Sequence, residues 1–565
     1  MSMRPESWPE PAAEVSQAVR AMYGRRRVPL PVVIRDELGE VFADAEFAQA
    51  FAVQGPAGWS PGRLALVTVL QMVENLTDRQ AAEAVRDKIS WKYALGLTLT
   101  DTGFDYTVLS QFRTRVVEHG LEQKALDLLV AALVERGLLK PGGKQRTDST
   151  HVLAAVRDLS RVELAGEAVR AALEAIAAAA PDWLTDVIDL PGWQQRYGQR
   201  IDSWRLPASK TRRDQIGAEY GRDARGLLET VYAPNSPPWL AQLPAVNTLR
   251  IVLVQNFVVT TDRQGREVIR MREATDGLPP ARLKITSPYD LDARRGRKRG
   301  LAWNGYKLHI SETCNAVAGS SGTAEVMPPN LITNVATTNA SVADAAMTEP
   351  IHHDLARRGL LPAEHYLDSG YPSADLLVSS HTDFGITLIT PILADTSTQA
   401  KTPGGYDRTA FTIDYTQHQA ICPQGHSNAN WIPGHQRGTA VITIGFPTSV
   451  CRPCPDKTRC TTASRRQLTI RPQPVQQAVD HARAEQATKQ WQAIYARRAG
   501  VEATIAQSIK ATDTRHARYH GLPKTTLEHA FKATALNLIR LYTWWTGQTL
   551  QPQHTTHLTR LQPTA

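Results

Sequence analysis

The chain has 565 residues, of which 42% are hydrophobic and 21% charged, and its net charge is +9. This composition excludes wholesale disorder and allows roughly two to four domains. Neither a signal peptide nor an apolar run near the roughly 18 residues of a membrane span is visible, so we expect a cytoplasmic protein with no membrane partner. The excess of Lys and Arg favours a polyanionic partner such as nucleic acid, although a basic enzyme without such a partner would have the same charge.

The N-terminal part of the chain divides into two stretches. Residues 1–45 are rich in Pro and charge, and we expect this segment to be only partly ordered. Residues 46–140 have helical periodicity; the helix after Pro61 is apolar enough to be largely buried, and Thr77 is placed to cap the next one. Short helices with tight turns are typical of a helix-turn-helix DNA-binding domain, although a plain helical bundle has the same pattern.

A strand with an unusual acid follows. Arg146–Val152 contains several β-branched residues and comes just after the Pro-Gly-Gly turn at 141–143, which predicts a β-strand. Asp148 stands in its middle. Strands rarely contain Asp unless a metal, a cation or several hydrogen bonds hold it, or unless it faces water on an edge strand. Asp148 is therefore the first candidate catalytic residue.

The middle of the chain predicts an insertion and a basic loop. Residues 155–285 are Ala-rich and helical at first, then rich in Trp and Pro, and we expect a helical insertion in which residues 251–260 form an apolar strand. Residues 294–300 form a basic run before the next strand. Lys298 and Arg299 in this predicted loop are candidate phosphate contacts, and a merely solvated loop is the alternative.

Strands and helices alternate from about 303 to 393, which predicts a mixed α/β sheet covered by helices. One short strand in this region ends on Asp368. Residues 395–475 interrupt the pattern with short polar strands and a cysteine cluster. Helical periodicity returns over 476–546, and we expect residues 547–565 to form a flexible tail.

Three carboxylates could form one site. Asp148 and Asp368 on adjacent strands would repel each other unless a cation lay between them. With Glu502 they could hold two Mg²⁺ ions about 3.5–4 Å apart, an arrangement suited to phosphoryl transfer. Tyr495 and Arg498 share a helix face with Glu502, and a phenol and a guanidinium there could grip a phosphate backbone. A surface helix with an ordinary Arg–Glu pair is the alternative for this last group.

Other polar residues extend this picture. Lys510, Arg515 and Arg518 follow Glu502 and continue the basic character of a DNA-binding surface. Asp290 and Asp292 stand beside the basic run, and we expect them to pair with its arginines rather than to bind a metal.

Four cysteines cluster within residues 422–460. In a reducing compartment, such clustering indicates a metal site rather than disulfides, and Cys451 and Cys454 form a chelating knuckle. Cys422 and Cys460 would complete a tetrahedral zinc site, with His426 as an alternative fourth ligand. Reduced cysteines without a metal remain the other interpretation.

Several short stretches stand in a fixed order between about residues 50 and 545: Phe104–Asp105 with Ser110–Arg113, Thr147–His151, Ser287–Arg294 with Asn304–His309, Leu367–Tyr371, and Tyr495-x-x-Arg498-x-x-x-Glu502. The ordered set resembles the DDE transposases of bacterial insertion sequences. It is most similar to the branch that has a helical N-terminal domain and a cysteine-bearing insertion before the catalytic Glu.

The resemblance implies an α/β fold: a ribonuclease-H-like mixed sheet flanked by helices, with an all-α N-terminal domain and a small cysteine-bearing insertion. Residues 141–394 and 476–546 would form the catalytic core. Asp148, Asp368 and Glu502 would be its catalytic residues and would bind Mg²⁺ or Mn²⁺. The expected partners are terminal inverted repeats and target DNA, with two copies of the chain in the synaptic complex.

One position departs from the family pattern. The family's signature helix often carries Lys seven residues after the Glu, whereas this chain has Ile509 there and Lys510 one residue later. Two other functions share much of the same pattern: a metal-dependent DNA nuclease without strand transfer, and a domesticated DNA-binding protein with an inactive site.

Overall fold

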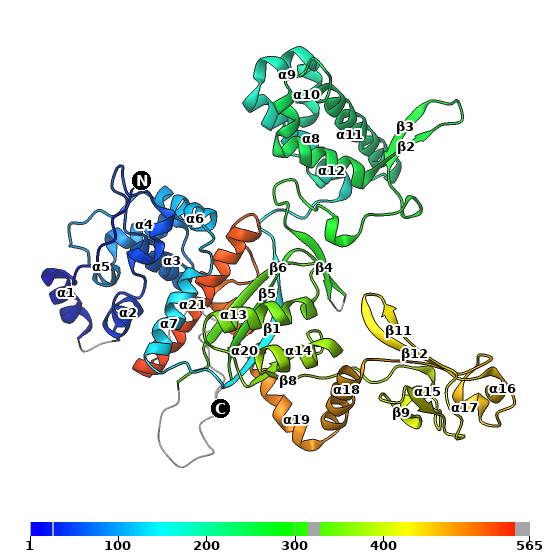
Figure 1. Cartoon of the computed structure of the whole chain (residues 1–565). Helices are drawn as coiled ribbons and strands as arrows, with labels where there is room; N and C mark the ends of the chain where they lie inside the picture. The colour runs from blue at the N-terminus through cyan, green and yellow to red at the C-terminus, as the bar shows by residue number, and fades with distance from the viewer. Residues whose placement is uncertain (1, 25–26, 299, 315–327, 549–565) are drawn as a thin grey trace, which may run out of the picture.

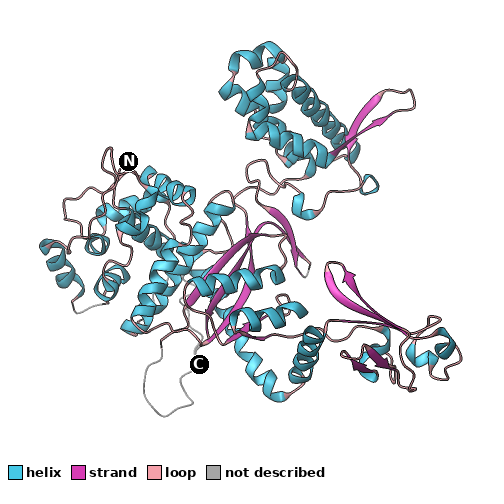
Figure 2. Ribbon diagram, in the orientation of Figure 1, coloured by secondary structure: helices cyan, strands magenta, loops and turns pink. Residues whose placement is uncertain are grey.

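A mixed sheet lies at the centre of the molecule, with three other groups of elements around it (Figure 1). The computed structural model describes residues 2–24, 27–298, 300–314 and 328–548. Helices of the N-terminal region lie on one side of the sheet, a helical bundle extends away from it, and a group of short strands lies at a third position (Figure 2).

The N-terminal region is helical, as predicted. Its elements are α1 (Ala13–Tyr23), α2 (Leu30–Leu38), η1 (Asp44–Ala50), α3 (Pro61–Glu74), α4 (Asp78–Asp87), α5 (Ile89–Leu95), α6 (Thr107–Glu118) and α7 (Lys124–Glu135). Helix α3 is buried along most of its length, and Thr77 caps α4 in a capping box with Gln80. Most of residues 2–45, which we expected to be only partly ordered, is folded: Leu30 and Ile34 of α2 are buried in the main core, because their i, i+4 spacing places them on one face.

The central sheet has six strands. They are β1 (Lys144–Leu153), β4 (Arg294–Lys298), β5 (Leu301–Thr313), β6 (Ile332–Asn339), β7 (Glu364–Leu367) and β8 (Thr387–Ile389). Strand β1 pairs antiparallel with β5 and parallel with β7, and β8 continues the sheet parallel to β7. Strands β4 and β6 pair with different stretches of β5, and both run antiparallel to it.

The predicted basic loop at 294–300 is wrong as a loop, because residues 294–298 form strand β4 of a hairpin with β5. Gly296 faces Trp303 across this hairpin, and a Cβ at Gly296 would lie 2.5 Å from the Trp303 ring. The strand was not predicted from the sequence, because its Arg and Lys residues are not among the β-branched and aromatic residues that favour strands. Arg299 lies outside the described residues.

Helices cover both faces of the sheet. On one face lie η6 (Asp344–Met347), α13 (Thr348–Arg357) and α14 (Ala374–Phe384). On the other lie α20 (Gly500–Thr512) and α21 (Leu522–Thr546), and α18 (Gln473–Gln486), α19 (Lys489–Tyr495) and η8 (Ala496–Ala499) lead into α20. Helix α21 also packs against α3 and α7, so the sheet and the N-terminal helices share one hydrophobic core.

Residues 155–285 form the helical bundle with a core of its own. Its elements are α8 (Arg161–Ala179), α9 (Pro181–Val187), α10 (Leu190–Tyr197), η2 (Ser203–Arg205), α11 (Lys210–Val231), η3 (Pro238–Gln242), α12 (Pro244–Asn256), the hairpin β2 (Phe257–Thr261) and β3 (Glu267–Met271), η4 (Ala274–Asp276) and η5 (Ala281–Leu283). The strand predicted over residues 251–260 is mostly wrong, because residues up to Asn256 belong to α12. A continuous apolar run does not distinguish a buried helix from a strand, and Pro244 at the start of α12 favours the helix.

Residues 395–475 contain small elements around a minor core that includes Phe411, Phe446 and Leu468. The elements are α15 (Thr398–Lys401), η7 (Arg408–Ala410), β9 (Thr412–Asp414), β10 (Gln419–Ile421), β11 (Asn430–Gln436), β12 (Thr439–Gly445), α16 (Thr448–Cys451), α17 (Lys457–Cys460) and β13 (Gln467–Ile470).

Within the described part of the chain, no helix is both long and apolar enough to cross a membrane. Residues 549–565, which make up most of the predicted tail, lie outside that part.

Candidate active site

Asp148 and Asp368 come together where the ladder between β1 and β7 ends. The parallel ladder between β1 and β7 ends with Thr147 opposite Leu367, so Asp148 is the next residue of β1 and Asp368 is the first residue after β7. Asp148 Oδ1 accepts a hydrogen bond from the backbone N–H of Ser149 at 2.7 Å. Asp368 Oδ1 accepts the backbone N–H of Gly370, also at 2.7 Å. Both carboxylates are therefore held by their own chain.

The surroundings of Asp148 affect its protonation. Burial raises the pKa of the Asp148 carboxyl, and the negative charge of Asp368 raises it further. The Ser149 N–H and the positive charges of Arg498 and Lys298 act in the opposite direction. Burial and the charge of Asp368 thus disfavour the ionised form of Asp148, and a nearby cation stabilises that form.

Arg498 supplies such a cation and brings in the third acid. Its Nη1 lies 3.1 Å from Asp148 Oδ2, and its Nη2 donates to Glu502 Oε1 at 2.7 Å. The Asp148 side chain is 12% exposed, whereas that of Glu502 is 61% exposed. One guanidinium thus bridges the acid on β1 and the acid on α20, and the open side of the site is that of Glu502.

The segment that carries Arg498 is not one continuous helix. We expected Tyr495, Arg498 and Glu502 to share a helix face. Instead α19 ends at Tyr495, a 3₁₀ turn carries Arg498, and α20 begins at Gly500. The three side chains still lie together: the Arg498 guanidinium is 6.0 Å from the Tyr495 ring centre, and that ring stacks on Trp491.

The acids suit a divalent metal by their chemistry, since carboxylate oxygens are the ligands that Mg²⁺ prefers. In the described residues, no group of three or more His, Cys, Asp or Glu side chains is arranged to hold a metal ion. At the Asp148–Glu502 pair the reason is visible, because the Arg498 guanidinium lies between the two carboxylates.

A further acid stands beside the site and was missed from the sequence. Asp344 in η6 pairs with Lys307 Nζ at 2.9 Å and accepts a hydrogen bond from Ser149 Oγ at 3.1 Å. A Cβ at Gly370 would lie 3.4 Å from Asp344 Oδ2 and 3.6 Å from Asp368 Oδ1, so Gly370 separates the two acids. No motif marks Asp344, and it stands in a polar turn that follows a strand.

A buried hydrogen-bonded pair, His309 and Tyr371, lies on the face of the sheet that carries the Ser149 side chain. His309 Nδ1 is 2.6 Å from the hydroxyl of Tyr371, which stands three residues after Asp368. Burial lowers the pKa of His309 to about 4, so this imidazole is neutral at pH 7. It acts as a hydrogen-bonding group of the core and adds no positive charge beside the acids.

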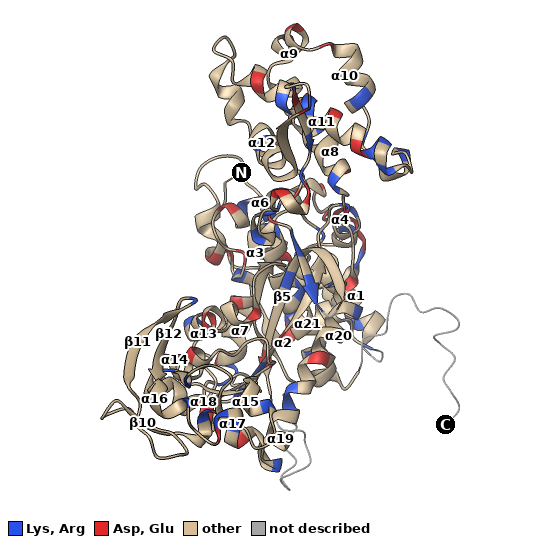
Figure 3. Cartoon of the chain, turned by 90° about the vertical axis from the view of Figure 1, so that its right-hand side faces the viewer, with Lys and Arg blue, Asp and Glu red and all other residues tan. Residues whose placement is uncertain are grey.

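The predicted DNA contacts lie in different surroundings. Lys298 is exposed at the end of β4, and its charge reaches Asp148; Figure 3 marks the basic residues of this hairpin in blue. Lys510 and Arg515 are exposed as well. The Arg518 guanidinium instead donates to the carbonyl of Leu76 at 2.7 Å and contacts Asn75, so it ties the segment after α20 to the N-terminal helices.

The two acids beside the basic run do not pair with its arginines, so that prediction is wrong. Asp290 is buried and accepts hydrogen bonds from the hydroxyl of Tyr306 at 2.6 and 2.7 Å. Asp292 accepts the backbone N–H of Leu522, which is the first residue of α21. Both acids anchor the chain after the helical bundle to the sheet and its helices.

The four clustered cysteines surround a small cavity of about 30 Å³, which His426 also lines. They are Cys422, Cys451, Cys454 and Cys460. Burial raises the pKa of the Cys460 thiol, and the other three sulfurs raise it further, against the charge of Arg466. The thiols are thus close enough to affect one another, although the described side chains form no ready set of metal ligands.

Two families of known proteins match parts of the chain. The transposase DDE domain matches residues 421–542, a range that includes Arg498 and Glu502. A transposase domain (DUF772) matches residues 25–115, which cover helices of the N-terminal region. Comparison with curated proteins and with solved structures finds no match.

Proposed function

Because the chain belongs to the DDE transposases of insertion sequences, we propose that it binds the terminal inverted repeats of its element, cleaves the DNA there and joins the freed 3′-OH to target DNA. The observation that carries the proposal is the meeting of three acids from distant segments: Asp148 and Asp368 where the ladder between β1 and β7 ends, and Glu502 bridged to Asp148 by Arg498.

The topology supports a ribonuclease-H-like core. Strands β6, β5, β1, β7 and β8 form a continuous order in which only β5 runs against the others. Asp148 and Asp368 come directly after the last paired residues of β1 and β7, and α20 brings Glu502 to the same place.

Each residue of the site has a role in this proposal. Asp148, Asp368 and Glu502 would hold Mg²⁺ or Mn²⁺, and the metal would polarise the phosphodiester and favour the ionised form of the attacking water or 3′-OH. Arg498 exchanges its exposed partner Glu502 for a phosphate of the DNA, which the planar guanidinium is suited to bind. The Tyr495 ring, 6.0 Å from the guanidinium, helps to keep it in place.

The remaining DNA contacts come from exposed basic residues. Lys298 on the β4–β5 hairpin and Lys510 and Arg515 beyond Glu502 bind the phosphate backbone, and the helices of residues 46–140 read the inverted repeats. Two copies of the chain hold the two element ends, and the protein acts in the cytoplasm, where a bacterial chromosome lies.

Purified protein, DNA that carries the element ends and Mg²⁺ or Mn²⁺ test the function. Wild-type protein should cleave this DNA and join its 3′ end to a target, whereas Asp148→Asn should bind the DNA but leave it uncut. Asp186→Asn, a change at an exposed acid of α9, is the matched control and should act as wild type. Cleavage without joining would indicate a nuclease, binding without cleavage by wild type a domesticated DNA-binding protein, and full activity of Asp148→Asn would exclude the proposed site.

The cysteine cluster is proposed to hold a structural Zn²⁺ through Cys422, Cys451, Cys454 and Cys460. The four thiols line one cavity, and the minor core around them is small, so a metal would add stability that this segment lacks. Metal analysis of the purified chain should find one zinc per molecule, and Cys454→Ser should lower that content. Zinc-free protein with an unchanged melting temperature would exclude the site.

A further inference from the structure

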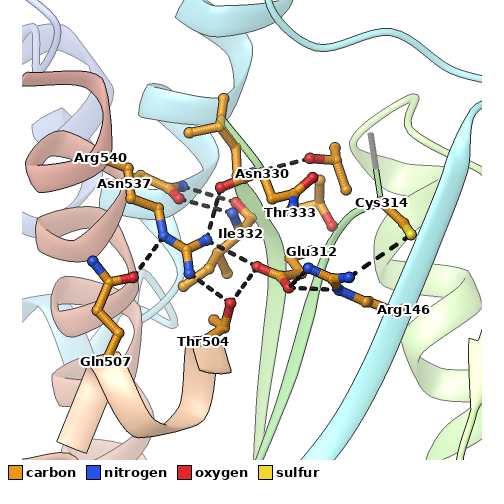
Figure 4. A network of polar contacts seen from close by, with 12 residues as sticks. Arg146, Glu312, Cys314, Asn330, Ile332, Thr333, Thr504, Gln507, Asn537 and Arg540 are labelled. Atoms are coloured by element: carbon orange, nitrogen blue, oxygen red, sulfur yellow. Dashed lines mark hydrogen bonds and ion pairs between the residues drawn. The ribbon is translucent and has the colours of Figure 1, made fainter. Parts of the chain in front are cut away.

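Arg146 lies on β1 two residues before Asp148, so the two side chains point to the same face of the sheet. The guanidinium of Arg146 is nearly enclosed. Its Nε and Nη2 both lie 2.7 Å from Glu312 Oε1 (Figure 4). Its Nη1 donates to the backbone carbonyl of Arg497 at 2.8 Å. Arg146 therefore holds the residue that immediately precedes Arg498.

Glu312 fixes this arginine from the neighbouring strand, where the two residues stand opposite each other. Its side chain is fully buried, and its second oxygen accepts hydrogen bonds from Thr504 Oγ1 at 2.6 Å and Arg540 Nη1 at 2.8 Å (Figure 4). Since Thr504 belongs to α20 and Arg540 to α21, one carboxylate ties both helices to the sheet. The Arg146 guanidinium thus has a fixed place.

Gly500 makes room for that guanidinium. It is the first residue of α20 and stands two residues before Glu502. A Cβ at this position would lie 2.0 Å from Arg146 Nη1 and 2.3 Å from its Cζ. A free arginine would move aside, but this one could do so only by giving up its bonds to Glu312 and to the Arg497 carbonyl.

We propose that Arg146 is a positioning residue for the reaction: held by Glu312 and seated against Gly500, it sets the start of α20, and thereby the place of Arg498 and Glu502 relative to Asp148. The inference rests on the proposed function for its catalytic consequence. Strand β1 then holds the segment 497–502 at two points, through Arg146 at Arg497 and through Asp148 at Arg498.

Gly500→Ala separates positioning from general stability. Alanine favours a helix more than glycine does, so a purely structural view predicts an unchanged or higher melting temperature and full activity. We expect the melting temperature to stay within a few degrees and cleavage of element-end DNA to fall on the order of 100-fold, because a small misplacement of reacting groups is enough for such a loss. Gly226→Ala in α11 is the matched control, since a Cβ at Gly226 meets no described atom within 4 Å, and it should retain full activity.

A double-mutant cycle tests whether Arg146 is the obstacle. In an Arg146→Lys background the thinner side chain leaves room at residue 500. Adding Gly500→Ala there should lower the cleavage of element-end DNA by less than about threefold, instead of the loss of about 100-fold expected with arginine. Equal losses in both backgrounds would overturn the role of Arg146.

Hydrogen exchange gives a readout that needs no DNA cleavage. In Arg146→Lys, amides of residues 498–503 should exchange faster than in wild type, while those of residues 530–540 in α21 keep their rate. If wild-type protein cleaves no DNA, the proposed function fails, yet this exchange still decides the positioning. Unchanged exchange at residues 498–503 together with a fully active Gly500→Ala would overturn the inference.

Discussion

Two arginine–carboxylate clusters lie on the same face of β1, and they differ in enclosure. Around Arg146 the carboxylate is Glu312, whose side chain is 0% exposed and is bonded to α20 and α21 as well. Around Arg498 the carboxylates are Asp148 and Glu502, and the latter is 61% exposed. The same chemical groups thus form a closed cluster and an open one, separated by two residues along the strand.

The difference shows how one strand can carry both a support and a reactive site. A buried ion pair cannot lose a partner without leaving a charge in the interior, so the closed cluster is fixed. An exposed pair contributes little to stability, because water solvates its members when they part. Arg498 can therefore leave Glu502 for another anion, and Glu502 can take another cation.

Removal of the buried carboxylate should have the largest effect on stability. Glu312→Ala leaves Arg146 and Arg540 buried without their shared anion, and we expect a loss of about 3–5 kcal/mol in the free energy of unfolding of the core. Urea denaturation followed by tryptophan fluorescence measures it. Glu229→Ala, which removes one partner of the exposed pair with Arg225, is the control and should cost at most about 1 kcal/mol. Equal losses of unfolding free energy in the two variants would contradict the view that burial makes the Glu312 pairs more important for stability than an exposed pair.

A carboxylate of intermediate exposure, Asp78, pairs with an arginine in the N-terminal helices. Asp78 accepts hydrogen bonds from Arg113 and Gln71, and its side chain is 27% exposed. Burial alone would raise the pKa of Asp78, but the bonds and charge of Arg113 lower it below its ordinary 3.8. Because the folded pKa is the lower one, the stabilisation is present above about pH 3.8 and is lost as the pH falls through the folded value.

Asp78→Asn should therefore lower the free energy of unfolding by about 1–2 kcal/mol at pH 7, after allowance for partial exposure of the side chain. The difference in melting temperature from wild type should shrink when the pH is lowered below 3.8. A difference that stays constant down to pH 2.5 would show that the ionised Asp78–Arg113 pair is not its source.

The open cluster should show the reverse pattern, with little effect on stability and a large one on activity. Glu502→Gln changes an exposed side chain, so we expect a stability change within about 0.5 kcal/mol. Cleavage of element-end DNA should fall to background, because the amide supplies no charge for a metal. Calorimetric titration with Mn²⁺ should show weaker binding than to wild type, and unchanged Mn²⁺ affinity would remove Glu502 from the proposed ligands.

The smallest effect is expected at Lys298, whose charge reaches the open cluster. Lys298→Ala should weaken binding to element ends and to unrelated DNA by the same factor and lower the slope of log affinity against log salt by about 1. Gel-shift titrations at several salt concentrations measure both. A loss confined to element ends would mean that this lysine reads bases.

The sequence predicted a mixed α/β protein with many helices, whereas the catalytic role of the three acids stays a prediction. Asp148 and Asp368 were chosen as candidates because each ends or interrupts a strand, and Glu502 because its helix matched a spaced motif. The mixed α/β character followed from the alternation of strands and helices.

What the sequence could not predict depends on distant contacts. Glu312 lies 166 residues from its partner Arg146, and an acid in an apolar strand carries no signal of which cation will face it. Strand β4 was predicted as a loop because its residues are mostly charged. Part of α12 was predicted as a strand because a continuous apolar run is compatible with either a helix or a strand. Asp344 was missed because only folding brings it beside Asp368.

Helix α21 has a consequence for synthesis on the ribosome. It packs against α3, α7 and β6 at once, and it is the last helix of the described chain to be made. Until residues near Tyr542 have emerged, the N-terminal helices and the sheet each expose the apolar surface that α21 later covers. Copies of the gene interrupted before this helix should therefore yield chains that aggregate or are degraded, rather than stable fragments that compete with the intact protein for DNA.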